Sequence, residues 1–313
     1  MDAYEECRLC PRNCGVDRTA GEKGVCCETA MCRIASSGPH FGEEPSFSGT
    51  RGSGTIFFTG CSSHCFFCQN HQISNEHLGR AVTPDELLKI GRRLAASGVH
   101  NLNFVTPDHF WPHVEYLCRT LRAEGVTLPF LFNSSGYQRP DMIARYGEVI
   151  DIFMPDFKFV DPALANACMG DERYPAVALD ALRRMVELKG FLDPWDPAGM
   201  SPAERGVLVR HLILPGHVEN SVAVLNLLRH EFGKFLPLSV MSQFHPVAEC
   251  FQRGELARRI TADEHQRVHD LVVELDFQHV YIQEFSPGAE FLPDFRKDEP
   301  FEGNRGRKGT GAG

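Results

Sequence analysis

The sequence has no long apolar run, although 42% of its 313 residues are hydrophobic. A helix that crosses a bilayer needs about 20 consecutive apolar residues, so we expect no membrane partner. The first ten residues, MDAYEECRLC, are acidic and lack the apolar core of a signal peptide, which predicts a cytoplasmic protein. No cluster of Lys and Arg gathers along one predicted face and the net charge is −9, so nucleic acid is not expected as a partner.

Cysteine, by contrast, is abundant. The chain holds 12 cysteines, and nine of them precede residue 70. Disulfides do not persist in a reducing compartment, so clustered cysteines are better interpreted as thiolate ligands, and their distribution predicts two metal sites near the N-terminus. Cys118, Cys168 and Cys250 stand alone, and we expect them to pack as small apolar side chains.

The pattern along the chain divides it into three regions. Residues 1–50 combine cysteines with a Gly-, Ser- and Pro-rich stretch, which predicts a small loop-rich extension held by metal. Residues 51–290 alternate short apolar strands with amphipathic helices and form the main domain. Residues 291–313 form a tail whose Gly-rich, basic end at 303–313 is expected to be disordered.

The alternation in the main domain predicts six βα units and a fold of the α/β class. Strands are expected at 55–60, 101–105, 128–133, 149–157, 207–214 and 236–244. Helices are expected at 83–97, 108–124, 140–146, 175–190, 219–233 and 263–275. Such units pair in parallel and form a partial (βα)6 barrel, with chemistry at the carboxyl ends of the strands. The Pro-rich stretch 190–206 is expected to be a surface insertion.

A compact cysteine triplet follows the first predicted strand. Cys61, Cys65 and Cys68 have the spacing C-x3-C-x2-C, and no fourth cysteine lies in the motif. Three thiolates can hold three irons of a cubane and leave the fourth iron open, as catalytic metal sites keep a vacant position. A structural zinc site and plain buried cysteines are the alternatives. Phe66 and Phe67, between the last two ligands, would shield such a cluster from water.

The words GSGTIFFTGCSSHCFFCQNHQIS, CPRNCGVDR and HFGEEP resemble known proteins. A C-x3-C-x2-C loop after the first strand of a six-unit α/β barrel is the signature of the radical S-adenosylmethionine (SAM) superfamily, and the resemblance covers roughly residues 50–285. The chain is similar in particular to the group labelled pyruvate formate-lyase activating enzyme-like, whose substrate is unassigned. The fold that this implies is a partial (βα)6 radical SAM barrel with a small cysteine-rich, metal-binding N-terminal extension.

The resemblance implies a 4Fe–4S cluster at the three cysteines, with SAM bound at the open iron. An electron from a low-potential donor of the flavodoxin or ferredoxin type then cleaves SAM to methionine and a 5′-deoxyadenosyl radical, which abstracts a hydrogen atom from substrate. The substrate is a glycyl radical enzyme, another protein or a small molecule. The alternative from another class is a non-catalytic iron–sulfur or zinc-binding protein for interaction or electron transfer, which would need fully ligated metal.

The resemblance also implies a SAM pocket at the strand ends. Where related enzymes have a Gly-Gly-Glu word that binds the SAM amino group, this chain has NFVTPDHF, and Thr106 occupies the matching place. On the third strand, Asn133 and Ser135 would face SAM, although N-S-S-G is also a good turn sequence. Phe67 would border both cluster and SAM.

Charged residues complete the expected pocket. Asp156 and Lys158 lie on one face of the fourth strand and resemble the Asp-Leu-Lys word of the activating enzymes. Arg210 matches an arginine that meets the SAM carboxylate, while its neighbour His211 points to the other face and is expected to be structural. His245 matches a histidine near the adenine.

The first cysteines form a second set with the spacing C-x2-C-x3-C-x11-C, made of Cys7, Cys10, Cys14 and Cys26. Four thiolates can close one coordination shell, so this set predicts a zinc site or a second iron–sulfur cluster, with redox cysteines as a further alternative and Cys32 as an alternative ligand. In the HFGEEP word, His40, Glu43 and Glu44 could cover the pocket mouth or lie in a solvated loop.

Overall fold

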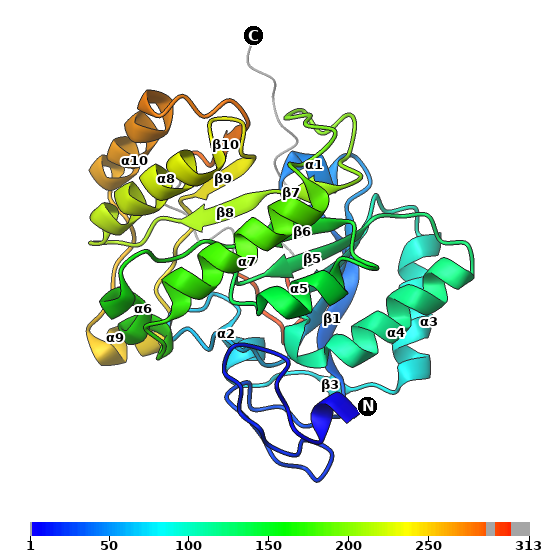
Figure 1. The fold of residues 1–313 in the computed structure, drawn as a ribbon. Helices are drawn as coiled ribbons and strands as arrows, with labels where there is room; N and C mark the ends of the chain where they lie inside the picture. Colours follow the sequence, from blue (N-terminus) through cyan, green and yellow to red (C-terminus); the bar gives the residue numbers. More distant parts are fainter. Residues whose placement is uncertain (1, 286–291, 302–313) are drawn as a thin grey trace.

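The computed structural model describes residues 2–285 and 292–301 and has an α/β fold built on a mostly parallel sheet (Figure 1). The strands are β1 (Arg33–His40), β2 (Ser53–Phe58), β3 (Arg80–Ala81), β4 (Leu102–Val105), β5 (Phe130–Ser134), β6 (Ile152–Pro155), β7 (Gly206–Val207), β8 (Val209–Leu212), β9 (Leu238–Met241) and β10 (Val280–Ile282). The helices are α1 (Pro45–Ser48), α2 (His71–Ser74), α3 (Pro84–Ala96), α4 (Trp111–Ala123), α5 (Pro140–Tyr146), α6 (Pro162–Met169), α7 (Tyr174–Lys189), α8 (Val218–Phe232), α9 (Ala248–Arg253) and α10 (Ala262–Glu274), with 3₁₀ turns η1 (Asp2–Tyr4) and η2 (Asp108–Phe110).

The strands form two sheets that join at one point. The larger has the order β3-β1-β2-β4-β5-β6-β7 and the smaller the order β10-β9-β8. A parallel bridge between Asp156 and Arg210 links them, with the Phe157 N–H donating to the Arg210 carbonyl at 2.7 Å. The strands β2, β4, β5, β6, β8 and β9 therefore follow one another as neighbours, and the predicted partial barrel of six parallel strands is confirmed.

The predicted helices form at the places that their capping residues and apolar periodicity indicate. At the start of α3, the Thr83 hydroxyl accepts from the Glu86 N–H while the Glu86 carboxylate accepts from the Thr83 N–H, which is a complete capping box. The apolar side of this helix, which includes Leu87, Ile90 and Leu94, is buried against the sheet and α4. Helices cover the outer face of the sheet, so the inner face is free to build a site (Figure 1).

Strand alternation separates an outer core from an inner one. In β6, Phe153 packs outward in the main apolar cluster, whereas Ile152 and Met154 pack inward around Phe47 of α1. Phe47 is fully buried and also contacts Leu131, in the first half of β5. The short helix α1 therefore closes the barrel at the amino ends of its strands.

The structure differs from the sequence-based expectations for two segments. The extension 1–50, expected to be loop-rich, contributes β1, which pairs antiparallel with β2 and places the segment that follows it inside the barrel. The stretch 190–206, expected to be a surface insertion, is partly buried, because Leu192 and Ala203 join the cluster around Phe47. Neither correction was visible locally, since both depend on contacts between distant segments.

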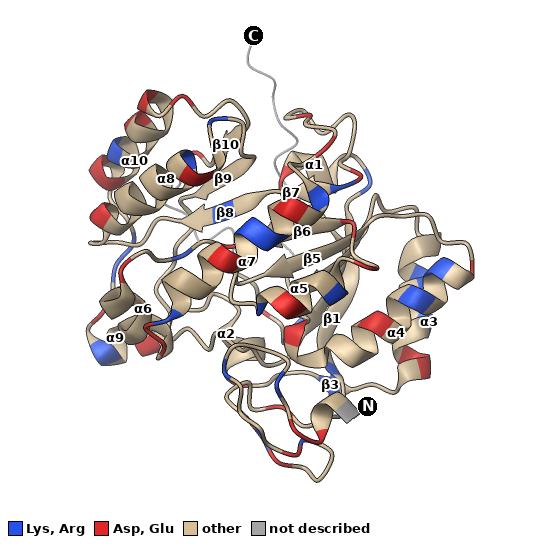
Figure 2. Ribbon diagram, in the orientation of Figure 1, with Lys and Arg blue, Asp and Glu red and all other residues tan. Residues whose placement is uncertain are grey.

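The described part of the C-terminal region packs against β2. Phe295 and Phe301 pack on Phe57 of β2, with ring centroids 5.2 and 5.4 Å away. The predicted disordered end, 303–313, lies outside the described residues. Within the described part, no helix has the length and apolar character needed to cross a membrane. Figure 2 shows Lys and Arg interspersed with Asp and Glu along the outer helices, in keeping with the scattered basic residues of the sequence.

Candidate active site

The inner face of the barrel encloses a cavity of about 410 Å³ at the carboxyl ends of the strands. Its walls come from the loop after β2, from the ends of β4, β5, β6, β8 and β9, and from the loop before α1. The structure brings together on this cavity all of the residues predicted for the cluster and SAM: Cys61, Cys65, Cys68, Phe67, Thr106, Asn133, Ser135, Asp156, Lys158, Arg210 and His245.

The cysteine loop begins with a turn that only glycine can make. Gly60 has φ of +73°, and a Cβ there would lie 2.7 Å from the Cys26 carbonyl oxygen. Cys61 and Cys65 follow as buried thiols, and Cys68 is half-buried. Burial and the nearby Cys68 raise the pKa of Cys61 to about 11, and burial likewise raises the pKa of Cys65. Without a metal, the Cys61 and Cys65 thiols are therefore neutral at pH 7.

The donor set fits an iron–sulfur cluster with one open iron. Three soft sulfur donors on one loop border the cavity, and among the described residues no fourth cysteine does. Within those same residues, no group of three His, Cys, Asp or Glu side chains is arranged around a single metal ion. A 4Fe–4S cubane does not need three ligands around one ion, because each thiolate binds a different iron of the cluster. Phe66 and Phe67, which lie within the loop between Cys65 and Cys68, are buried as expected.

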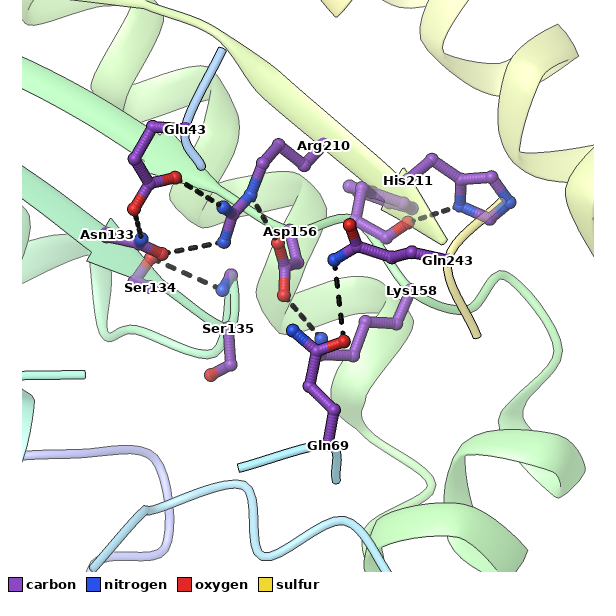
Figure 3. Close-up of polar contacts among 12 residues, drawn as sticks. Glu43, Gln69, Asn133, Ser134, Ser135, Asp156, Lys158, Arg210, His211 and Gln243 are labelled. Carbon is purple, nitrogen blue, oxygen red and sulfur yellow. Dashed lines mark hydrogen bonds and ion pairs between the residues drawn. The ribbon is translucent and has the colours of Figure 1, made fainter. Parts of the chain in front are cut away.

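Arg210 organises the charged wall of the cavity (Figure 3). Its Nε donates to Asp156 Oδ1 at 3.0 Å, its Nη1 lies 3.3 Å from Glu43 Oε2, and its Nη2 donates to Asn133 Oδ1 at 2.7 Å. Lys158 Nζ donates to the other oxygen of Asp156 at 2.5 Å. One carboxylate thus bridges the two cations from neighbouring strands.

The protonation states of this wall follow from burial and pairing. Burial alone raises the pKa of Asp156, but Lys158 and Arg210 outweigh it and hold the pKa below its ordinary value. For Lys158, burial lowers the pKa, and the neighbouring Asp156 carboxylate more than offsets that effect. The cluster of Asp156, Lys158 and Arg210 is therefore fully charged at neutral pH.

The other predicted residues have distinct local roles. Thr106 has φ of +48°, which is unusual for a β-branched residue, and its N–H donates to the Asn133 carbonyl at 2.8 Å. Such strain is often stored at functional sites, and here it turns the chain at the end of β4 toward the cavity. The Ser63 hydroxyl bonds that of Ser135 at 2.6 Å, which ties the cysteine loop to β5. His245 donates from Nδ1 to the Pro246 carbonyl at 3.0 Å.

Sequence reasoning left Glu43 undecided between pocket and solvent, and missed Asn103. The Glu43 side chain is only 7% exposed and accepts from Asn103 at 2.9 Å and from Asn133 at 3.2 Å, so the solvated-loop interpretation is wrong for it. Asn103 is fully buried in the middle of β4. A polar amide inside the apolar run NLNFV was the available signal, because buried amides need partners.

The expected structural role of His211 is confirmed. Its Nδ1 donates to the Phe157 carbonyl at 2.7 Å and its Nε2 accepts from the Ser221 hydroxyl at 2.8 Å, on the face turned away from the cavity. Burial lowers the pKa of His211 to about 4, so it is neutral at pH 7. Arg210, the adjacent residue, faces inward, as strand alternation requires.

The N-terminal cysteines gather around a buried arginine. Cys7, Cys10 and Cys26 are buried, and Cys14 is half-buried. Arg18 is 1% exposed, lies over the Tyr4 ring at 4.6 Å and donates to the His109 carbonyl and, at 3.7 Å, to Cys7 Sγ. In the described residues, Arg18 forms no ion pair with a carboxylate.

A second arginine of this N-terminal region holds the catalytic loop. Arg12 donates from Nε to the Ser62 carbonyl at 2.9 Å and from Nη2 to the Ser63 carbonyl at 3.1 Å. The same side chain donates to the Met169 and Gly170 carbonyls at the carboxyl end of α6. The hydrogen bonds of Arg12 therefore connect the N-terminal cysteine-rich region directly to the loop of the cysteine triplet.

Comparison with known proteins places this geometry in a family. Residues 55–225 match the sequence model of the radical SAM superfamily. An uncharacterized protein of Methanocaldococcus jannaschii is 25% identical over 291 residues, which are 89% of this chain and 77% of the relative.

Similar solved structures include SuiB of Streptococcus suis bound to SAM, with 10% identity and a TM-score of 0.49 over 72% of this chain. Methylornithine synthase (PylB) has 15% identity and a TM-score of 0.48 over 71% of this chain. HydG, a maturase of the FeFe hydrogenase, has 15% identity and a TM-score of 0.47 over 77%. The matched region spans only 48%, 60% and 54% of those three chains, so their activities and substrates are not transferred to this one.

Proposed function

Because the chain belongs to the radical SAM superfamily, we propose that it cleaves SAM reductively at a 4Fe–4S cluster bound by Cys61, Cys65 and Cys68, and that the resulting 5′-deoxyadenosyl radical abstracts a hydrogen atom from a substrate. The observation that best supports this proposal is the single cavity shared by the cysteine triplet and the charged wall of Asp156, Lys158 and Arg210. A cluster and SAM need such a common cavity.

The charged wall retains donors for a ligand. The guanidinium of Arg210 has more N–H groups than its contacts with Asp156, Glu43 and Asn133 use, so it can also meet the SAM carboxylate. The ammonium of Lys158 donates to Asp156 and has further N–H groups that face the cavity. Asn133 and His245 line the same cavity as further polar partners for the ribose and adenine.

Apolar side chains would keep water from the reacting atoms. Phe67 contacts Phe159 and Phe244, with ring centroids 6.3 and 6.0 Å away, and these rings stand directly beside the cysteine loop. Phe57 and Phe301 line the cavity from the side of β2. Exclusion of water strengthens every electrostatic contact in the site and protects a radical from unwanted hydrogen donors.

We propose further that Cys7, Cys10, Cys14 and Cys26 hold zinc or a second iron–sulfur cluster. The support is Arg18, a buried guanidinium that pairs with no carboxylate among the described residues, because a buried charge requires a counter-charge. Metal-bound thiolates would supply that negative charge next to Cys7. A second cluster here could relay electrons from a donor of the flavodoxin or ferredoxin type.

The substrate is the next part of the proposal. Similarity to the activating-enzyme-like group supports a glycyl radical enzyme as the substrate, in which case a partner protein would gain a radical on a backbone glycine. A non-catalytic electron-transfer or interaction protein is the alternative from another class. A cluster with an open iron serves no purpose in an electron carrier, which favours the enzyme.

The decisive experiment is product analysis with the reconstituted wild-type protein. After anaerobic loading with iron and sulfide and reduction by dithionite, we expect methionine and 5′-deoxyadenosine to form from SAM in equal amounts. A protein that contains a reducible cluster but forms neither product would support the electron-transfer alternative instead.

A further inference from the structure

The end of the cavity opposite the cysteine loop has an unusual charge. Glu43 and Glu44 enter it from the segment between β1 and α1, and α1 packs at the amino ends of the strands. The cysteines follow the carboxyl end of β2. We call the residues Gly42 to Pro45 the cavity floor.

The two floor carboxylates differ in their partners. Glu43 is satisfied by Arg210 at 3.3 Å, by Asn103 and by Asn133. In the described residues, no Lys, Arg or His nitrogen lies within 4.0 Å of the Glu44 carboxylate, and Ser239 is the uncharged side chain that acts to lower its pKa. Burial raises the pKa of Glu44, Arg210 acts against this from a greater distance, and Glu43 adds to it. Glu44 is therefore an enclosed carboxylate without a counter-ion of its own.

The charges that line the cavity do not balance. The cations Lys158 and Arg210 are both committed to Asp156, and Arg210 also serves Glu43, so Glu44 is the carboxylate in excess. His40, which also lines the cavity, does not compensate, because burial lowers its pKa to about 4. An enclosed charge without a partner is costly unless a ligand supplies one.

A second feature at the floor also lacks a donor. Asn103 is fully buried, and its Nδ2 donates to Glu43, which fixes the orientation of the amide. Its Oδ1 has no hydrogen-bond partner. Asn103 does not line the cavity itself but contacts Glu43, which does. Because buried acceptors are nearly always satisfied, its orphaned oxygen indicates that a donor is missing next to the floor.

We infer that the cavity floor receives a cationic group of the substrate, a protonated amine or a guanidinium, with Glu44 as its counter-ion. The inference rests on the proposed function, because it names the substrate class of that site. With SAM held at the cysteine end, a cation at the floor would fix the substrate at one end and expose its neighbouring C–H bonds to the radical. A free amine and the Lys or Arg side chain of a peptide offer the same chemistry.

Calorimetric titration of the full-length reconstituted protein, saturated with SAM, tests the inference. The free probes are L-lysine and agmatine, and L-norleucine is the uncharged match of lysine. The peptide probes are the tripeptides Gly-Lys-Gly and Gly-norleucine-Gly. The variants are Glu44→Gln, which removes only the charge, and Glu274→Gln on the exposed end of α10 as the matched control. Iron content and circular dichroism establish that each variant is folded.

We expect wild type and Glu274→Gln to bind at least one cationic probe about tenfold or more tightly than its neutral match, and Glu44→Gln to lose this preference. Binding of free lysine or agmatine alone would indicate a small substrate, and binding of the lysine tripeptide alone a peptide. Equal binding of charged and neutral probes by wild type would overturn the inference, as would an unchanged preference in Glu44→Gln. Should Glu44→Gln not fold, the wild-type comparison still decides. A wild type that fails to cleave SAM in the product analysis bears on the proposed function alone.

Discussion

Asp156 stands between the two cations of the cavity, at 3.0 Å from Arg210 and 2.5 Å from Lys158. Removing Asp156 leaves Lys158 and Arg210 without their main counter-charge. The two cations then repel each other across the space that the carboxylate had filled. The positions of both cations therefore depend on this carboxylate. A ligand that binds Lys158 or Arg210 depends on Asp156 even where it does not contact it.

We predict that Asp156→Ala weakens SAM binding by roughly five- to 150-fold, which corresponds to about 1–3 kcal/mol for buried partners left unpaired. Calorimetry on proteins with equal iron content measures it. Asp151→Ala is the matched control, because Asp151 accepts from the Phe130 N–H and pairs with Arg122 outside the cavity. Wild-type affinity in Asp156→Ala would mean that SAM is held by other residues.

His211 gives a pH signature of its own. Its pKa in the folded protein is about 4, against about 6.5 in an unfolded chain, so the unfolded state binds more protons between these values. Stability from this group is therefore present above pH 6.5 and is lost as pH falls toward 4. We expect the free energy of unfolding in urea to fall by about 2 kcal/mol more in wild type than in His211→Asn between pH 7 and pH 5. Parallel curves for the two proteins would contradict this.

At this scale, the sequence identified residues whose chemistry conflicts with their surroundings. Asp156 and Lys158 were recognisable because charges rarely enter an apolar strand. Glu43 was not, because an acidic residue in a Gly- and Pro-containing loop looks the same whether the loop faces water or a cavity. Only the return of the chain from β1 into the barrel decides between the two, and that is a contact between distant segments.

Elements with complete local signals were predicted well. The capping box of α3 marks where that helix begins, and short apolar runs mark the strands β2, β4, β5 and β6. The strand β1, with the sequence RIASSGPH, has little apolar alternation and forms because the edge of β2 offers it hydrogen bonds. The short helices α6 and α9 were not predicted, since one or two turns carry too little periodicity.

The loop of the cysteine triplet makes a prediction at the same scale. Arg12 is 8% exposed and its guanidinium holds the Ser62 and Ser63 carbonyls, so Arg12→Ala leaves buried acceptors unsatisfied. We expect the free energy of unfolding to fall by about 2–4 kcal/mol and the catalytic cluster to bind less iron. Arg8→Ala is the matched control, because the Arg8 side chain is exposed and bonds Glu6 and Asn13 of its own segment. Equal iron in the two variants would show that the loop holds its shape without Arg12.

At the scale of the whole molecule, the cysteine-rich N-terminal region is part of the barrel's architecture. Arg12 links it to the cysteine loop, and Arg18 links it to the His109 carbonyl in η2, directly before α4. The sequence predicted two cysteine sites. It could not predict that Arg12 and Arg18 connect them to the barrel, because these side chains bond backbone carbonyls, which every residue has. The division at residue 50 stays a prediction.

The N-terminal cysteines should bind metal independently of SAM chemistry. We predict that Cys26→Ala lowers the total metal content of purified protein by the share of one site, while folded protein still binds SAM. Elemental analysis distinguishes zinc from iron, and Cys27→Ala is the matched control, because Cys27 adjoins Cys26 but points its sulfur toward the Val25 carbonyl. An unchanged metal content in Cys26→Ala would remove the proposed second site.

The proposed function depends above all on Cys61, Cys65 and Cys68 as the ligands of the cluster that cleaves SAM. The most direct measurement is the amount of 5′-deoxyadenosine formed by reduced, reconstituted Cys65→Ala, compared with Cys168→Ala, whose buried thiol lies near the loop but outside the cavity. We predict that Cys65→Ala forms none and loses the iron of one cubane, while Cys168→Ala keeps both. Undiminished 5′-deoxyadenosine from Cys65→Ala would contradict the assignment of the catalytic site.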